Sequence, residues 1–519
     1  MASRSLFTPQ PMAAGGQQAP LVDWARLDPS SIPQEIPARI LLLAYEEVDI
    51  FPYGLGGSGG TLVEVDMVGS PEGSEPAEVY AVGPETEQVG LCITRGETRY
   101  VMFFDPSDDR LIIVNKSPHS VIYKRLDVGD VLEVQSNAST VLTLGTWALG
   151  VGTDEWLIEF KLLARTPPHI SQEPSTKRSA RDETALTKRS RLSANQSTTR
   201  TAAVQGVSPG NPLLTIDRGE AIHVGAGESG YKLKRLGTIA DTRHSSIWKA
   251  EHSKMPGEVV AVKVIKPNSR RQESTIEAIE DWMRELSIHS SLGLHYAIVP
   301  YLGCDARFNA IFTKHIDAKS LVHHVVDEES FEFNGNSVRA WRILGDMASA
   351  LSFLHANRII HGDIKPANIL FHSVHGAVLV DFNLSFREGD PAPGYGAPWY
   401  LPPEFLEDEN ARGSASDMWA LGVVMMWVLR KIPMPELTRS WIVGDIHPDG
   451  PRTLAIHKKA QARMEDWINT VQAGNNELQE EGGEMANVVG MLVQQVKEKR
   501  SNAETLVQEL DKCNLCTSD

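Results

Sequence analysis

The stretch HGDIKPANIL, residues 361–370, decides the fold of this 519-residue chain. It follows the helical periodicity WRILGDMASALSFLHAN and precedes the apolar strand pattern AVLV. A second short motif, Asp381-Phe-Asn383, comes directly after that strand, eighteen residues beyond Asp363. Two polar motifs at the ends of short neighbouring elements are therefore expected to lie close together.

Four side chains of these motifs suit the transfer of a phosphoryl group. That reaction needs a carboxylate to orient a hydroxyl, ligands for a metal ion that neutralises phosphate charge, and a cation at the γ-phosphate. Asp363 is the candidate catalytic carboxylate and Lys365 the candidate cation, while Asn368 and Asp381 are the candidate Mg²⁺ ligands. Alone, either aspartate could equally be a turn or cap residue, and only order and spacing favour function.

The motifs resemble those of eukaryotic protein kinases, over roughly half of the chain. Lys263, in the strand pattern VAVK, is similar to the lysine that holds the α- and β-phosphates of ATP, and Glu285 to the helix glutamate that pairs with it. The segment that joins the two lobes is expected through Lys314 and Ile316, with Thr313 at the gatekeeper position. The resemblance implies ATP and Mg²⁺ as cofactors.

The implied fold is a bilobal domain over residues 230–512, with a small β-rich lobe and then a larger helical lobe. The stretch GAPWYLPPE, which closes with Glu404, resembles the end of an activation segment, and Arg500 the late arginine that pairs with this glutamate. Asp417 is similar to the residue that starts the central buried helix, although it could also simply cap its helix. The apolar run at 419–429 is too short to span a bilayer, so we expect a buried helix.

The spacing Asp363-Ile-Lys365 resembles the serine/threonine-specific class of the family. We therefore expect a protein serine/threonine kinase that transfers the γ-phosphoryl group of ATP to protein substrates. Asn383 replaces the usual glycine of its motif, and we expect it to adopt the left-handed backbone conformation that the turn needs.

The nucleotide-covering loop departs from the family pattern. Glycines let backbone amides approach phosphate closely, but Ala240, Thr242 and Ser245 stand where the three glycines belong. Gly237, three residues early, and Ser245 remain the candidate nucleotide-binding residues of this loop. The alternative interpretation is a pseudokinase that binds partners as a scaffold, with weak or no catalysis.

The activation segment, residues 381–404, lacks the usual sites of control. Gly362 replaces the arginine that commonly receives a phosphate on this segment. The segment contains no threonine, and its hydroxyl residues are Ser385, Tyr395 and Tyr400. Both observations predict activity that is independent of activation-segment phosphorylation.

The N-terminal third of the chain differs from the rest in composition and in sequence pattern. Residues 1–35 are rich in Pro, Gly, Ser and Gln, which indicates a flexible leader without a secretory signal. Across residues 36–165, short β-rich runs alternate with turn formers such as YGLGGSGG, DPSDD and LDVGD, which predicts an all-β sandwich or barrel.

This β-rich module weakly resembles forkhead-associated domains, which suggests a phosphoprotein or another protein as its partner. It lacks the Gly-Arg pair followed by Ser-x-x-His with which that family grips phosphothreonine. A third hypothesis makes the module the part that reads a partner and delivers the kinase to it.

Residues 166–212 are rich in Ser, Thr, Pro and Gln and poor in large apolar residues, which predicts a disordered basic linker. Its basic clusters at 177–178 and 188–191 resemble a bipartite nuclear import signal, and the alternative is a solvated charged tether. The expected location is accordingly the nucleus or the cytoplasm.

Composition narrows the classes of partner. The formal charge of −17, from 50 basic and 67 acidic residues, argues against a general binder of nucleic acid or anionic membranes. Four cysteines are too few to cross-link a chain of this length with disulfides, which indicates a reducing compartment. We therefore expect protein partners, with no direct nucleic acid and no membrane.

Overall fold

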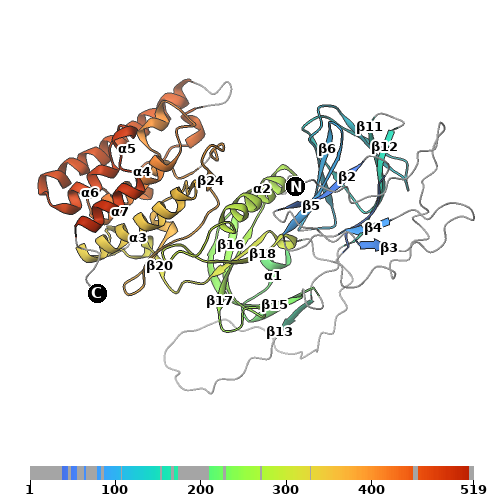
Figure 1. Ribbon diagram of the computed structural model, residues 1–519, viewed down its shortest axis with the longest axis horizontal. Helices are drawn as coiled ribbons and strands as arrows, with labels where there is room; N and C mark the ends of the chain where they lie inside the picture. Colours follow the sequence, from blue (N-terminus) through green and yellow to red (C-terminus); the bar gives the residue numbers. More distant parts are fainter. Residues whose placement is uncertain are drawn as a thin grey trace, which may run out of the picture. The chain divides into compact units, whose positions relative to one another are not determined.

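The computed structural model describes residues 38–44, 48–54, 63–65, 79–82, 87–106, 108–151, 155–164, 169–172, 210–225, 230–268, 272–327, 329–394, 396–447 and 454–513. The predicted leader, 1–35, lies outside these ranges. The chain divides into two compact units: unit 1 is Met1–Ala278 with Cys304–Ala310, and unit 2 is Ile279–Gly303 with Ile311–Asp519. Figure 1 shows that unit 1 consists mainly of strands and unit 2 mainly of helices.

The N-terminal part of unit 1 consists of two antiparallel sheets. Their strands are β1 (Ile40–Ala44), β2 (Asp49–Gly54), β3 (Val63–Val65), β4 (Val79–Val82), β5 (Gln88–Arg95), β6 (Thr98–Phe104), β7 (Leu111–Asn115), β8 (Val121–Arg125), β9 (Val131–Val134), β10 (Ser139–Leu142), β11 (Gly145–Val151) and β12 (Glu155–Leu162). The described strands are ordered β3-β4-β1-β12-β11-β8-β9 in one sheet and β10-β7-β6-β5-β2 in the other.

One buried apolar cluster joins these two sheets. It includes Leu91 and Tyr100 from one sheet and Trp147 and Phe160 from the other. The strands contribute alternate side chains to this cluster, because successive residues of a strand point to opposite faces of its sheet. The predicted β-rich module is present, although β2 extends into the YGLGGSGG stretch that was expected to be a turn, while its likeness to forkhead-associated domains stays a prediction.

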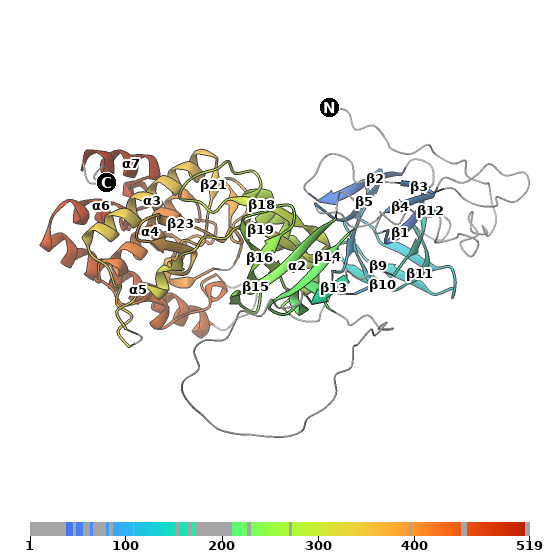
Figure 2. The same cartoon turned by 90° about the horizontal axis from the view of Figure 1, so that it is seen from below.

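The C-terminal part of unit 1 contains a third antiparallel sheet. Its strands in this unit, in their spatial order, are β13 (His169–Gln172), β14 (Glu220–Val224), β15 (Tyr231–Asp241), β16 (Ser245–His252) and β17 (Val259–Ile265), and the short helix α1 (Pro212–Thr215) precedes β14. Figure 2 shows β13 beside β14, and the two strands pair from His169 opposite His223 to Gln172 opposite Glu220.

Strand β13 lies inside the segment that the sequence predicts to be a disordered linker, 166–212. Because β12 ends at Leu162, only residues 163–168 separate the two-sheet part from this third sheet. The basic clusters at 177–178 and 188–191 lie outside the described residues. The predicted linker thus contains an ordered strand, which forms the edge of the sheet by pairing with the distant strand β14.

Strands β18 (Tyr301–Asp305) and β19 (Ala310–Lys314) and helix α2 (Gln272–His289) carry the chain between the units. In unit 1 the turn between these strands is held by buried polar contacts. Tyr231 Oη donates to Asp305 Oδ2 at 2.5 Å, and Arg307 Nε donates to Asp305 Oδ1 at 2.9 Å. Asn211 Nδ2 donates to the carbonyl of Phe308 at 2.7 Å. The buried carboxylate is therefore fully paired, as burial of a charge requires.

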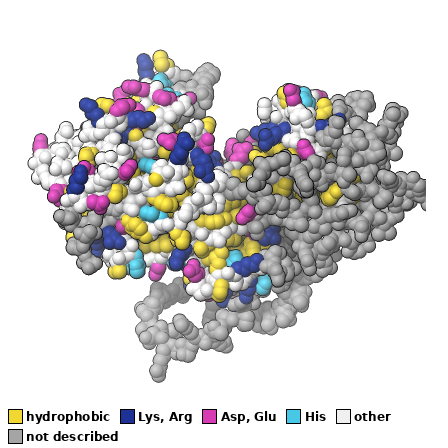
Figure 3. All heavy atoms as spheres, viewed as in Figure 1, with side chains coloured by type: hydrophobic (Ala, Val, Ile, Leu, Met, Phe, Trp, Pro, Cys, Tyr) yellow, Lys and Arg dark blue, Asp and Glu magenta, His cyan; other side chains and the backbone are white. Residues whose placement is uncertain are grey.

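Unit 2 is built mainly from helices. They are α3 (Ser337–Ala356), α4 (Ser414–Val428), α5 (Leu454–Glu481), α6 (Glu484–Leu492) and α7 (Ala503–Lys512). Figure 3 shows Lys, Arg, Asp and Glu side chains interspersed over the face of this unit that it displays. Among the described helices, none is both long enough and apolar enough to cross a membrane.

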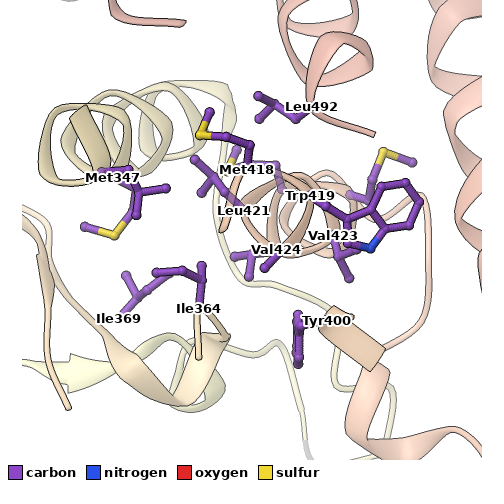
Figure 4. Packing of buried hydrophobic residues seen from close by; sticks show 14 of the residues in the cluster. Met347, Ile364, Ile369, Tyr400, Met418, Trp419, Leu421, Val423, Val424 and Leu492 are labelled. Carbon is purple, nitrogen blue, oxygen red and sulfur yellow. The ribbon is translucent and has the colours of Figure 1, made fainter. Parts of the chain in front are cut away.

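Helix α4 lies at the centre of unit 2. Thirteen of its residues, from Ser416 to Val428, are buried, because the helix is apolar on every side. Figure 4 shows it surrounded by Met347 of α3, by Ile364 and Ile369 of the HGDIKPANIL stretch, and by Leu492 of α6. The prediction of a buried helix is confirmed, although the helix ends at Val428 and Leu429 is half-buried.

Short strands frame the two polar motifs in unit 2. They are β20 (Lys319–Ser320), β21 (Ile359–Ile360), β22 (Ile369–His372), β23 (Gly376–Leu379) and β24 (Phe386–Arg387). Strand β21 directly precedes residues 361–368 and β22 directly follows them, while β23 ends just before Asp381. The antiparallel pairs β22 with β23 and β21 with β24 therefore fold the two motifs back toward each other.

Candidate active site

Asp417 of α4 holds the loop between β21 and β22 in place. Its carboxylate accepts hydrogen bonds from the backbone amides of His361 and Gly362, each at 2.9 Å. Burial alone would raise the pKa of Asp417, but its contact with His355 at 2.9 Å lowers it, so the group stays ionised. The N-cap of α4 is Gly413, which rules out the simple capping role for Asp417.

Three predicted site residues meet at the Asp363 carboxylate. Lys365 Nζ donates to Asp363 Oδ2 at 2.6 Å, and Asn368 Nδ2 donates to the same oxygen at 2.9 Å. Asn368 Nδ2 also donates to the Asp363 carbonyl at 2.9 Å, which closes the loop on itself. Both side-chain contacts use Oδ2, so neither of them occupies the second oxygen of the carboxylate.

Lys365 lies in a field of negative charge. Burial alone would lower its pKa, but the carboxylates of Asp363, Asp381 and Glu436 together raise it above the ordinary value. The side chain therefore remains an ammonium ion at neutral pH. The amide of Val380, the residue before Asp381, donates to the Asn368 carbonyl at 3.0 Å, which brings the second motif next to the first.

The second motif adopts an unusual backbone conformation. Asp381 has a φ of 71°, in the left-handed region, whereas Asn383 is not among the described residues with positive φ. The expectation that Asn383 would take this conformation is therefore wrong. A left-handed L-residue costs about 1–2 kcal/mol, and such strain persists where the surroundings hold it. Fully buried Phe382, the next residue, fixes the motif in the core.

Phe382 belongs to a cluster of rings that sequence reasoning missed. Its ring centroid lies 4.6 Å from that of His289 on α2 and 5.1 Å from that of His361, and His289 in turn lies 5.7 Å from Tyr301. His361 is fully buried, and burial lowers the pKa of its imidazole. Only the position of His289, one helical turn after Glu285, could have suggested the cluster.

Two polar pairs close the site around residues 396–404. The predicted pair of Arg500 and Glu404 is present, with Nη1 to Oε1 at 2.8 Å and Nη2 to Oε2 at 2.9 Å. The other pair was not predicted: Tyr400 Oη donates to Glu436 Oε1 at 2.8 Å. Burial raises the pKa of Glu436, and its Oε2 has no hydrogen-bond partner among the described residues.

Comparison with known proteins identifies this arrangement. The sequence matches the protein kinase domain family over residues 239–510, a little over half of the chain. The chain belongs to the protein kinase family. Such a domain uses ATP, and the match accounts for the order of the motifs at Asp363, Asp381, Glu404 and Arg500.

Several curated relatives of this kinase domain are named as kinases. Cyclin-dependent kinase G1 of Arabidopsis thaliana is 27% identical over 210 residues, which cover 39% of this chain and 34% of the relative. Serine/threonine-protein kinase PKZ1 of Phytophthora infestans is 30% identical over 199 residues, 33% of this chain and 48% of the relative. Serine/threonine-protein kinase RUNKEL of Arabidopsis thaliana is 39% identical over 111 residues, 20% and 8% respectively. The chain thus spans less than half the length of each relative, and these names support the serine/threonine class.

The remaining predicted site residues of the kinase domain are distributed over both units. Lys263 lies on β17 in unit 1, opposite Ile247 of β16, whereas Glu285 is buried on α2 in unit 2. Their pairing stays a prediction. The residues expected to join the lobes lie on β19 or just after it and also stay predictions: Thr313, Lys314 and Ile316.

The nucleotide-covering loop of the kinase domain is the hairpin turn between β15 and β16. Thr242 Oγ1 accepts hydrogen bonds from the amides of His244 at 3.2 Å and Ser245 at 3.0 Å. These amides are already bonded to a side chain, which weakens the capacity of this turn to hold phosphate. A Cβ on Gly237 would meet no atom of the described residues within 4 Å, so this position does not require glycine.

Proposed function

We propose that the chain is an active protein serine/threonine kinase that transfers the γ-phosphoryl group of ATP to hydroxyls of protein substrates. The observation that carries this proposal is the convergence of Lys365 and Asn368 on a single oxygen of Asp363. It leaves the second carboxylate oxygen to orient a substrate hydroxyl, while the ammonium ion of Lys365 offsets the negative charge of the transferred group.

The residues present fit a magnesium ion. Because Asn368 donates through Nδ2, its Oδ1 remains as a candidate ligand atom together with the carboxylate of Asp381, and Mg²⁺ prefers such oxygen ligands. The described ranges hold no cluster of three or more His, Cys, Asp or Glu that could bind a metal by itself. Mg²⁺ is commonly bound by one or two protein groups together with phosphate oxygens. When bound, it neutralises charge on the phosphates.

We also propose that activity does not depend on phosphorylation of the activation segment. Ser385 is fully buried and donates to the His361 carbonyl at 3.0 Å, and the Tyr400 hydroxyl is buried against Glu436. Neither hydroxyl is exposed to another kinase in this conformation. Tyr395 lies outside the described residues.

Replacing the candidate catalytic carboxylate tests the function. Asp363→Asn keeps the shape of the side chain but removes its charge, so kcat for a peptide substrate should fall by about 10²–10⁴-fold. The melting temperature should change little. The matched control is Asp466→Asn on the exposed face of α5, for which kcat should equal that of the wild type. Equal turnover by Asp363→Asn would show that the assignment is wrong.

A scaffold without catalysis is the second candidate, and the contacts of Thr242 Oγ1 favour it because they occupy amides of the nucleotide-covering turn. Thermal unfolding of the wild type with ATP and Mg²⁺, followed by a phosphoryl-transfer assay, separates the two candidates. A binder without transfer activity, or a protein that does not respond to nucleotide, would favour the scaffold.

A further inference from the structure

An arginine from a distant segment stands beside Gly362. Arg412 belongs to the loop before α4, and its Nη2 donates to the Gly362 carbonyl at 2.8 Å. Its Nη1 donates to the carbonyl of Pro393 in the activation segment. One half-buried guanidinium therefore joins the loop that carries Asp363 to the activation segment.

Position 362 requires a glycine. Its φ is 74°, and a Cβ at this position would lie 2.6 Å from the Leu384 carbonyl oxygen and 3.4 Å from Arg412 Nη2. The backbone conformation and the close carbonyl both exclude a side chain. An arginine at position 362, as in many kinases, does not fit here, and a guanidinium reaches this region from position 412 instead.

An arginine at position 362 and Arg412 differ in the groups through which they hold the activation segment. An arginine that pairs with a phosphorylated residue holds the activation segment only after modification. Arg412 instead donates to two backbone carbonyls, which are present in every state of the chain. Its planar fork of donors suits two acceptors in a fixed geometry, whereas a lysine offers one compact charge.

The position of Arg412 also links it to the site. A small cavity beside the loop is lined by Gly362, Asp363, Gly396, Tyr400 and Arg412, among other residues. Displacement of the guanidinium would open this cavity next to the candidate catalytic carboxylate and free the carbonyl of Pro393.

We propose that Arg412 is a permanent latch that holds the activation segment against the catalytic loop without phosphorylation. This inference rests on the proposed kinase function and deepens it, because it names the residue through which the segment is kept in place. Arg412 is a positioning residue, since its Nη2 contacts the backbone carbonyl of Gly362, the residue before Asp363.

The test compares Arg412→Ala and Arg412→Lys with the control Arg439→Ala, an exposed arginine of unit 2. For Arg412→Ala we expect kcat to fall about tenfold, because two charge-assisted hydrogen bonds are lost, with the KM for ATP unchanged. Amide hydrogen exchange should become faster across residues 384–397. Arg412→Lys should give intermediate values for both, and the control should match the wild type.

Hydrogen exchange tests the latch and phosphoryl transfer tests the proposed function, so each can fail without the other. If the wild type transfers no phosphate, the proposed function fails, and hydrogen exchange still decides on the latch. If exchange over 384–397 is the same in Arg412→Ala and the wild type, the latch is overturned, even where the melting temperature has fallen. Should Arg412→Ala not fold, Arg412→Lys provides the same comparison.

Discussion

At the residue scale, Glu436 is a half-buried carboxylate that accepts a hydrogen bond from Tyr400. Burial raises its pKa above the ordinary value of 4.5, although the bond from Tyr400 and the charge of Lys365 act in the opposite direction. The folded protein therefore binds a proton at Glu436 more readily than the unfolded chain does. Stability from this group is present at low pH and is lost as the pH rises through the folded-state pKa.

Glu436→Gln should consequently stabilise the protein at neutral pH, because the amide keeps an acceptor for Tyr400 but carries no charge. We expect a higher melting temperature than the wild type at pH 7–8 and a difference that shrinks toward zero below about pH 4.5. Melting curves across pH measure this, with the exposed Glu465→Gln as control. A lower melting temperature for Glu436→Gln at pH 8 would contradict the argument.

At the element scale, α4 and α6 approach each other closely at Gly422. A Cβ there would lie 2.7 Å from Val493 Cγ1 and 3.0 Å from Leu492 Cβ. Real side chains do not pack at such distances, so the two helices meet only because this position is glycine. The apolar run in the sequence predicted that this helix is buried, but it did not show which residue contacts its neighbour.

Gly422→Ala should therefore destabilise the fold. Overpacking costs about 1–3 kcal/mol, which exceeds the roughly 1 kcal/mol that alanine contributes to helix propensity. The midpoint of urea unfolding should shift to lower concentration. Gly444→Ala is the control, because a Cβ there meets no described atom within 4 Å. An unchanged midpoint for Gly422→Ala would mean that the helices separate without cost.

At the scale of the whole molecule, strand β13 joins the N-terminal part of the chain to the sheet of the kinase domain. It pairs with β14 over four residue pairs, so removing it exposes a new sheet edge. A chain that begins at residue 211 should therefore show faster hydrogen exchange in β14 than one that begins at residue 166, together with a lower melting temperature. Equal exchange in both chains would show that β13 adds nothing to this sheet.

Local spacing in the sequence was sufficient for much of the site. Asp363, Lys365 and Asn368 lie within six consecutive residues, so the local course of the backbone brings them together, and the apolar run of α4 has to be buried wherever it packs. Tertiary structure alone decided the contacts between distant segments. Arg412 meets Gly362 across 50 residues and Tyr400 meets Glu436 across 36, and the left-handed residue proved to be Asp381. The reason is physical: periodicity reports which face of a segment avoids water, whereas a directional hydrogen bond depends on where the folded chain returns.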